Sequence, residues 1–187
     1  QTLAWNEPIF INGVKISLHP AGHIIGSSQV RVEYNGEVWV FTGDYTTEND
    51  GISGQYEHIR CNSFITESTF GLPIYTWKPQ QEIYNNIQDW VLQNQQDDKN
   101  SGVIAYSLGK AHRVMDAVRN ITDTVYVHGA IYNMQQVLDG LRYNFLKVNR
   151  ITPETTKQEL KNAVVIAPPS ADGTPWMKKL NPYRLGI

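Results

Sequence analysis

Two Asn-Gly pairs, at residues 12–13 and 35–36, constrain the fold of this chain more than any other feature of its sequence. Both central residues of a tight hairpin turn need positive φ, which Asn and Gly adopt at low cost, so Asn-Gly between alternating apolar runs predicts a β-hairpin. The predicted strands are Ile9–Ile11, Val14–Leu18, Gln29–Tyr34 and Glu37–Phe41, with a mostly buried fifth at Cys61–Thr66. Residues 1–72 are therefore expected to form a sheet built from hairpins.

The hydrophobic period changes around Gly71–Pro79. Gln80–Gln95 carries apolar side chains at helical spacing, with Pro79 near its first turn. Beyond it, strands and helices alternate, which predicts a parallel sheet with right-handed crossovers over residues 73–187. The expected strands are Val103–Tyr106, Thr124–Val127, Phe145–Val148 and Ala163–Ala167, and the expected helices are Lys110–Arg119, Met134–Arg142 and Glu154–Lys161.

Charge is distributed unevenly along the chain. The net charge of −2 shows no overall excess of positive charge of the kind that favours binding to nucleic acid. Residues 1–99, however, hold 5 Lys and Arg against 12 Asp and Glu, whereas residues 100–187 hold 11 against 6. An acidic half that binds metal beside a basic half that meets phosphates would suit a nuclease. Chance variation on solvated faces is the alternative explanation.

Membrane insertion and disulfide bonding are both disfavoured. No run reaches the 18 or more apolar residues of a membrane helix. The single cysteine, Cys61, cannot form an internal disulfide, which fits a reducing compartment, and we expect a cytoplasmic protein without a membrane partner. Cys61 has no neighbouring Cys or His pair, so we interpret it as a buried strand residue rather than a nucleophile.

A candidate pair of metal ligands follows two of the predicted strands. His23 lies in the segment HPAGHIIG and Asp44 in FTGDY, at the expected ends of adjacent strands. Imidazole and carboxylate are the usual ligands of a catalytic zinc, and the preceding Gly22 and Gly43 would let backbone and substrate approach closely. Capping of the turn after the strand is the structural alternative for Asp44. His19 is expected to bond to backbone at its strand end.

Four motifs occur in order within residues 19–114: HPAGHIIGSSQV, FTGDY, FITESTFG and AYSLGKAHRV. This series resembles the beta-CASP branch of the metallo-beta-lactamase-fold nucleases. Within that branch it is most similar to the bacterial ligase-associated DNA exonucleases, with the RNA 3′-end processing endonucleases as more distant relatives. The resemblance runs over nearly the whole chain. It implies an α/β protein in which residues 1–72 are part of a metallo-beta-lactamase αββα sandwich. Residues 73–187 would be a beta-CASP domain with a parallel, Rossmann-like sheet, lacking its C-terminal part.

The resemblance also implies roles for residues of the acidic half. His23 would be a metal ligand, and Asp44 would bridge two divalent metal ions, expected to be zinc. Asp44 and Glu67 would be the catalytic residues, with Glu67 as the acidic residue of the first beta-CASP motif; a turn cap over Ser68–Gly71 is its structural alternative. The family's His-x-His-x-Asp-His and Asp-His-Ala-Asp motifs do not occur in the chain. We therefore expect an internal piece of a longer enzyme, metal-poor and inactive by itself.

A second candidate site is the loop Ser107–Arg113, which follows a predicted strand and opens a helix. Free backbone N–H groups and the positive helix end are expected to hold a substrate phosphate there, together with Ser107 and Gly109, while Lys110, His112 and Arg113 add positive charge. His128 ends another strand and is expected to contact substrate from the same sheet edge. The spacing departs from a Walker loop, which disfavours nucleotide hydrolysis. A plain helix-entry turn with solvated charges is the alternative.

These features predict a metal-dependent nuclease that hydrolyses phosphodiester bonds of DNA or RNA. The resemblance favours a DNA exonuclease with a DNA ligase as a partner. The alternatives are an RNA 3′-end processing nuclease of the same branch and a non-catalytic nucleic-acid-binding paralogue. Four aromatic residues are candidates for stacking on unpaired bases, with core packing as the alternative: Tyr75, Trp77, Tyr106 and Trp176.

Overall fold

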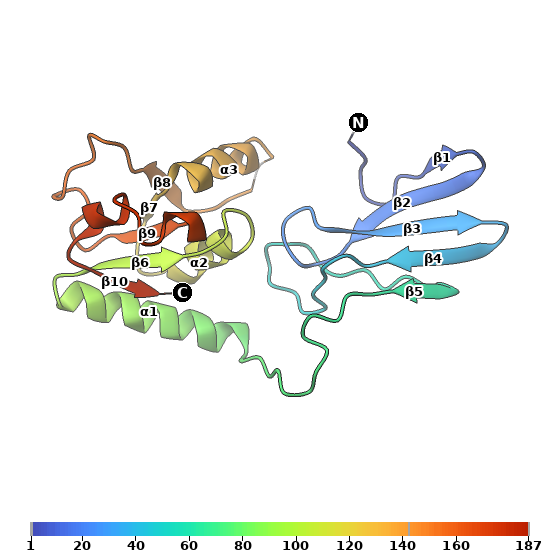
Figure 1. Cartoon of the computed structure of the whole chain (residues 1–187), viewed down its shortest axis with the longest axis horizontal. Coiled ribbons are helices and arrows are strands. Elements are labelled where there is room, and N and C mark those ends of the chain that lie inside the picture. The colour runs from blue at the N-terminus through green and yellow to red at the C-terminus, as the bar shows by residue number, and fades with distance from the viewer. Residues whose placement is uncertain (1, 142, 187) are drawn as a thin grey trace. The chain divides into compact units, whose positions relative to one another are not determined.

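The computed structural model describes residues 2–141 and 143–186, and the chain divides into two compact units, Gln1–Trp77 and Lys78–Ile187 (Figure 1). Unit 1 contains a five-stranded sheet in the order β1-β2-β3-β4-β5. Its strands are β1 (Ile9–Ile11), β2 (Val14–Pro20), β3 (Ser28–Tyr34), β4 (Glu37–Phe41) and β5 (Ser63–Ile65).

Both predicted hairpins are present. Asn12 and Gly13 have φ of 50° and 80° between β1 and β2, and Asn35 and Gly36 have φ of 49° and 82° between β3 and β4. The two turns therefore use the left-handed conformation that the Asn-Gly pairs favour. The prediction of a mostly buried strand at Cys61–Thr66 is wrong in length and burial. β5 is a three-residue edge strand paired only with β4, and two of its side chains are exposed.

The buried face of the unit 1 sheet is the polar one. Successive strand residues point to opposite faces, so Ser17, His19 and Gln29 share one face with Val40. These four side chains are buried, whereas Trp39 and Phe41 on the other face are exposed. The irregular segment 44–60 bonds to the end of β2 through the Thr46 and Glu57 amides, which donate to the carbonyls of Ala21 and Pro20.

Unit 2 contains a parallel sheet in the order β10-β6-β9-β7-β8, as the alternating pattern predicts. Its elements are α1 (Gln80–Gln96), β6 (Asn100–Ile104), α2 (Lys110–Val118), β7 (Thr124–Val127), α3 (Gly129–Gly140), β8 (Lys147–Arg150), β9 (Val164–Ala167), the 3-10 helices η1 (Pro169–Ala171) and η2 (Met177–Leu180), and β10 (Tyr183–Gly186). The predicted α/β class, one sheet of hairpins and one parallel sheet, is confirmed.

Two apolar clusters fill the two faces of this parallel sheet. Val164 and Ile166 of β9 belong to the cluster that α1, α2 and α3 complete. Val165 and Ala167 alternate with them and belong to the cluster that η1 and η2 complete. The α-helices therefore pack on one face, and the 3-10 helices pack on the other. In the described part of the chain, no helix is long and apolar enough to cross a membrane.

The predicted helix Glu154–Lys161 is wrong, because this segment forms only turns. The Glu159 carboxylate accepts bonds from both the amide and the hydroxyl of Thr156, and Asn162 has φ of 58°. With the bond from the Glu159 amide to the Thr156 hydroxyl, these contacts form a capping box, which starts a helical turn. Left-handed Asn162 ends that turn before it can extend into a helix. α3 begins at Gly129, earlier than the predicted Met134; the predicted end at Arg142 lies outside the described residues.

Candidate functional site

Three predicted site residues of unit 1 follow strands that run in the same direction. β2 and β4 are each antiparallel to β3, and β5 is parallel to β4, so the carboxyl ends of β2, β4 and β5 lie at one end of the sheet. His23, Asp44 and Glu67 come directly after these ends. The expectation that His23 and Asp44 follow adjacent strands is wrong, since β3 lies between β2 and β4. His23 and Asp44 lie at the same end of the sheet because β2 and β4 run in the same direction.

His23 and Asp44 are close enough to act on one ion. His23 Nε2 lies 3.9 Å from Asp44 Oδ2, and their side chains are 43% and 73% exposed. Two exposed donors at this separation are reachable by a ligand from solvent. The His23 amide is bonded to the Ser27 hydroxyl at 3.0 Å, which fixes the backbone of the loop that carries the imidazole.

Gly22 sets the shape of that loop. It has φ of +72°, and a Cβ at this position would lie 2.3 Å from the Thr46 carbonyl oxygen. A distance this short is sterically forbidden, so the backbone of segment 44–46 approaches the loop as closely as it does only because residue 22 has no side chain. The expectation of a close backbone approach at Gly22 is confirmed. Gly43 also has positive φ, at +55°, but a Cβ there would be in ordinary contact.

Two residues support the His23 loop in roles that the sequence did not predict. Gln29 is fully buried, and its amide nitrogen donates to the Pro20 carbonyl at 3.0 Å and to the Glu57 carbonyl at 2.7 Å. His19 bonds through one ring nitrogen to Ser17 Oγ and through the other to Glu57 Oε1, both at 2.9 Å. Its predicted bond to backbone is therefore wrong. No sequence signal indicated these roles, because polar alternation in a strand ordinarily marks the solvated face.

Glu67 is held as an anion. Its Oε2 accepts a bond of 2.7 Å from the Thr69 amide. This bond and the Thr69 hydroxyl lower the pKa of Glu67, and the nearby charge of His23 lowers it further. Glu67 thus caps the turn at Thr69, in agreement with its structural alternative, and it also interacts electrostatically with the candidate metal ligand.

The donor types at this end of the sheet fit a divalent metal ion, but their number is small. A catalytic zinc site generally uses three protein ligands and a water. Within residues 2–141 and 143–186, no group of three or more His, Cys, Asp or Glu side chains is arranged to hold a metal. His23 and Asp44 can therefore supply part of a coordination shell.

In unit 2 the candidate substrate residues lie at the carboxyl edge of the parallel sheet. The chain moves from β6 to β7 and β8 in one direction, then returns through β9 to β10 in the other. β6 and β9 are neighbours whose following connections leave toward opposite faces, and open α/β sheets bind ligands at such a switch point. The loops that begin at Ala105 and Pro168 meet there, with the Ala105 amide bonded to the Ala167 carbonyl at 2.9 Å.

The start of α2 offers fewer free N–H groups than the sequence suggests. Gly109 is the N-cap with φ of 82°. The Ala111 amide donates to the Tyr106 carbonyl, and the His112 and Arg113 amides donate to the Gly109 carbonyl. The Arg113 bond is the first regular bond of the helix, whereas the expectation of free first-turn amides is wrong for Ala111 and His112. The Lys110 ammonium lies 5.6 Å from the centre of the exposed Tyr106 ring. A phosphate bound here would therefore interact mainly with the charged side chain of Lys110 and less with backbone amides.

His128 is the N-cap of α3. Its Nδ1 accepts a bond of 3.2 Å from the Ala130 amide, and its ring contacts Trp176 at a centroid distance of 5.0 Å. Partial burial and the charge of Arg150 lower the pKa of His128, so the ring is neutral at pH 7 and Nε2 carries the proton. Its substrate contact stays a prediction, whereas its capping role is directly visible.

His112 is fully buried, so the expectation that it adds charge to the phosphate site is wrong. It lies on the apolar face of α2 and contacts the Phe145 ring at 4.7 Å. Burial lowers its pKa to about 4, although Gln135 and Asp139 oppose this shift. The ring is therefore neutral at pH 7 and belongs to the core of unit 2.

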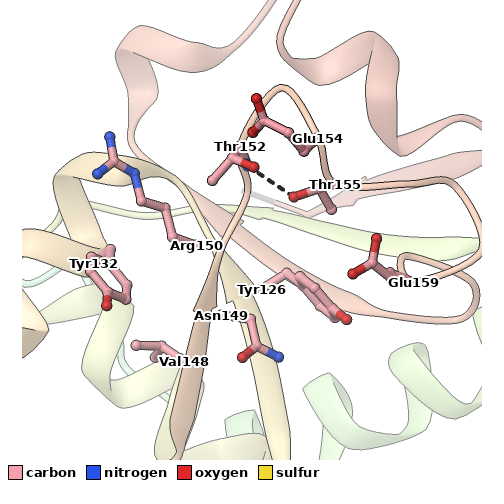
Figure 2. Close-up of a pocket in the computed structure, with 9 residues that line it drawn as sticks. All are labelled: Tyr126, Tyr132, Val148, Asn149, Arg150, Thr152, Glu154, Thr155 and Glu159. Atoms are coloured by element: carbon pink, nitrogen blue, oxygen red, sulfur yellow. Dashed lines mark hydrogen bonds between the residues drawn. The ribbon is translucent and has the colours of Figure 1, made fainter.

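A pocket of about 460 Å³ lies around β8 (Figure 2). Tyr126 and Asn149 lie on one side of the strand, and Tyr132 and Val148 lie on the other. Its wall includes Glu159, which the Thr156 bonds already hold, and none of the predicted site residues.

No family model matches the chain, but curated proteins do. A probable DNA ligase of Opitutus terrae is 25% identical over 174 residues, which are 92% of this chain and 17% of that protein. RNase aCSPSF2 of Saccharolobus solfataricus is 28% identical over 145 residues, 75% of this chain and 29% of that protein. Endoribonuclease YSH1 of Saccharomyces cerevisiae is 34% identical over 73 residues, 38% of this chain and 9% of that protein. The chain spans less than a third of each relative.

A solved structure supports the fold. A protein of unknown function from Enterococcus faecalis V583 superposes with a TM-score of 0.59 at 13% identity, covering 89% of this chain and 44% of that one. At this identity the likeness shows the fold alone. The curated relatives confirm the resemblance to the beta-CASP nucleases of the metallo-beta-lactamase fold.

Proposed function

We propose that this chain is part of a metal-dependent nuclease that hydrolyses phosphodiester bonds of nucleic acid. The observation that carries the proposal is the convergence of His23, Asp44 and Glu67 at one end of the unit 1 sheet. Relatives named RNase and endoribonuclease support it. In this proposal residues 1–72 are a partial metallo-beta-lactamase domain and residues 73–187 a beta-CASP domain.

Each residue has a distinct part in this proposal. His23 donates a ring nitrogen, and the exposed Asp44 carboxylate offers two oxygens that can bridge a pair of ions. Bound zinc ions would activate a water and neutralise charge on the phosphate oxygens. Glu67 stays ionised beside His23 and orients the imidazole electrostatically. In unit 2, Ser107, Gly109, Lys110 and Arg113 hold a substrate phosphate at the switch point of the sheet, with His128 on the same edge.

DNA is the substrate we favour, with a DNA ligase as a partner. The relative that covers 92% of this chain is a probable DNA ligase, which supports end processing coupled to ligation. An RNA nuclease is the second candidate, and the named RNase and endoribonuclease relatives favour it. A cytoplasmic location is part of the proposal, because Cys61 is a free thiol.

The test compares three variants of the full-length protein that contains this chain. Asp44→Asn should lower metal-dependent cleavage by more than about 100-fold, beyond the 10- to 100-fold loss typical of outer-shell partners. Binding to DNA should change little, because a neutral amide removes the bridge between cations and leaves the phosphate contacts. Glu48→Gln removes an exposed charge from the same segment and should leave cleavage unchanged. Wild-type cleavage and metal content in Asp44→Asn would contradict the metal assignment.

The third variant, Lys110→Gln with Arg113→Gln, separates binding from cleavage. It should weaken binding similarly for all sequences, since phosphate contacts carry no base information. The plot of log affinity against log salt should flatten by about 0.7 to 0.9 units for each phosphate that the variant no longer neutralises. An unchanged affinity and slope would favour a plain helix-entry turn.

A further inference from the structure

The segment that follows Glu67 exposes an unusual run of large apolar side chains. Trp77 is 69% exposed, and four other side chains between residues 70 and 75 are also exposed: Phe70, Leu72, Ile74 and Tyr75. Core packing, the alternative explanation for Tyr75 and Trp77, is therefore wrong for both. Single exposed apolar residues are common, whereas a contiguous patch of them marks an interaction site.

Three of these side chains form an aromatic cluster, which we define as Phe70, Tyr75 and Trp77. The Phe70 ring contacts the Tyr75 ring at 5.1 Å and 77°, and the Trp77 ring at 5.1 Å and 87°. Both contacts are edge-to-face. Such contacts orient the rings without stacking one on another, so the indole of Trp77 keeps most of its area accessible.

Local bonds give the segment a defined shape. The Gly71 amide donates to the Ser68 carbonyl and the Tyr75 amide donates to the Leu72 carbonyl, both at 3.2 Å, which forms two successive turns. A Cβ on Gly71 would lie 2.7 Å from the Ser68 hydroxyl, so the first turn is tightly packed. A cluster that is already ordered loses little conformational entropy when a ligand binds.

The cluster begins three residues after Glu67 in the chain. The Thr69 amide, one residue before Phe70, holds the Glu67 carboxylate at 2.7 Å, and Glu67 interacts electrostatically with His23. A strand whose phosphate reached His23 and Asp44 would therefore carry its neighbouring bases near this segment.

We propose that the aromatic cluster stacks on unpaired bases of a single-stranded nucleic acid beside the metal site. This inference rests on the proposed nuclease function and names residues that would select single-stranded over double-stranded substrate. Base stacking on aromatic rings is tolerant of sequence, because every base has a π-face, and it suits an enzyme that must pass along a strand. The competing interpretation is that the cluster binds an apolar protein surface. Such a surface would be recognised by its shape, and its binding would not depend on nucleic-acid bases.

The test measures binding of the 187-residue chain, without added metal, to three labelled probes. These are a single-stranded oligo-dT, an abasic strand of equal length and a duplex. Trp77→Ala should weaken oligo-dT binding by about 5- to 150-fold, the range for removal of one stacked base. It should leave abasic-strand binding unchanged, since the phosphates are the same. Phe10→Ala is the matched control, equally exposed at 69% but on β1, at the opposite edge of the sheet from β5.

The outcomes separate this inference from the nuclease proposal. Equal binding of oligo-dT and the abasic strand by the unsubstituted chain would overturn the stacking role, even if Asp44→Asn abolished cleavage in the full-length protein. Loss of base-dependent binding in Trp77→Ala would support the stacking role even if cleavage were absent. A change in oligomeric state with unaltered oligo-dT binding would overturn it in favour of a protein contact.

Discussion

The two units differ most in how they bury apolar surface. Among the described residues of unit 1, four apolar side chains are buried, namely Ala21, Ile25, Val40 and Tyr56. The two apolar clusters found among the described residues lie in unit 2, on the two faces of its parallel sheet. Unit 1 keeps its buried polar residues around the His23 loop and leaves apolar residues such as Trp39 exposed.

Packing and chemistry are thus divided between the units. Burial of apolar surface contributes about 25 cal/mol per Å², so unit 2 has the larger source of stability. The candidate metal ligands lie in unit 1. There, hydrogen bonds from Gln29 to the Pro20 and Glu57 carbonyls fix the His23 loop, and burial of apolar side chains contributes little to its stability. Unit 1 is therefore the unit whose order depends most on individual polar contacts.

The largest expected effect comes from separating the units. Residues 78–187 expressed alone should unfold in one cooperative urea transition, because both faces of their sheet are covered. Residues 1–77 alone should show no cooperative transition and should bind a hydrophobic dye, because a sheet with so few buried apolar residues cannot offset its conformational entropy. Circular dichroism and dye fluorescence check both. Cooperative unfolding of residues 1–77 would contradict the difference in stability inferred for the two units.

A smaller effect is expected within unit 1 from two glycines on one loop. Gly22→Ala should destabilise the loop by at least about 3 kcal/mol, because the new Cβ meets the Thr46 carbonyl at 2.3 Å where φ is already +72°. Gly26→Ala is the control: its φ is +80°, but nothing lies within 4 Å. It should cost only about 1–2 kcal/mol. Hydrogen exchange of the Thr46 amide measures both, and equal protection in the two variants would refute the steric argument.

The smallest effect concerns pH and unit 2. The folded pKa of His112 is about 4, below the ordinary value of 6.5, so the unfolded state binds more protons between these values. Stability should fall as pH drops from about 6.5 to about 4, by about 3 kcal/mol in all. His112→Gln should flatten this dependence in urea unfolding of residues 78–187. His128→Gln, at a partly exposed position, should preserve most of it; a steep slope retained in His112→Gln would contradict the assignment.

Local signals in the sequence predicted the fold well, and signals that depend on distant contacts did not. The Asn-Gly hairpins and α1 agree closely with the structure, because turn chemistry and helical spacing act over a few residues. The helix at Glu154–Lys161 was wrong because the turn that starts at Thr156 is cut short by left-handed Asn162 and by β9, which pairs with β6 from far earlier in the chain. β10 was missed because Tyr183–Gly186 becomes a strand only by pairing with β6, some 80 residues earlier.

The same division holds for the candidate site. His23 and Asp44 were found as a pair, and the structure places them 3.9 Å apart. The sequence did not predict that Gln29 holds the His23 loop, because nothing in it indicates that the polar face of the unit 1 sheet is buried. The exposure of Trp77 was left open by the sequence, which allowed both base stacking and core packing for this residue.

The order of strands in unit 2 also affects the time course of folding. β6 is formed by residues 100–104, yet its two neighbours in the sheet, β9 and β10, come from residues 164–186. The hairpins of unit 1, by contrast, join strands a few residues apart and can close within microseconds. During synthesis at about 5–20 residues per second, β6 therefore waits for several seconds with both edges unpaired. During that interval unit 2, which has the larger apolar core once it is folded, is more exposed to aggregation than unit 1.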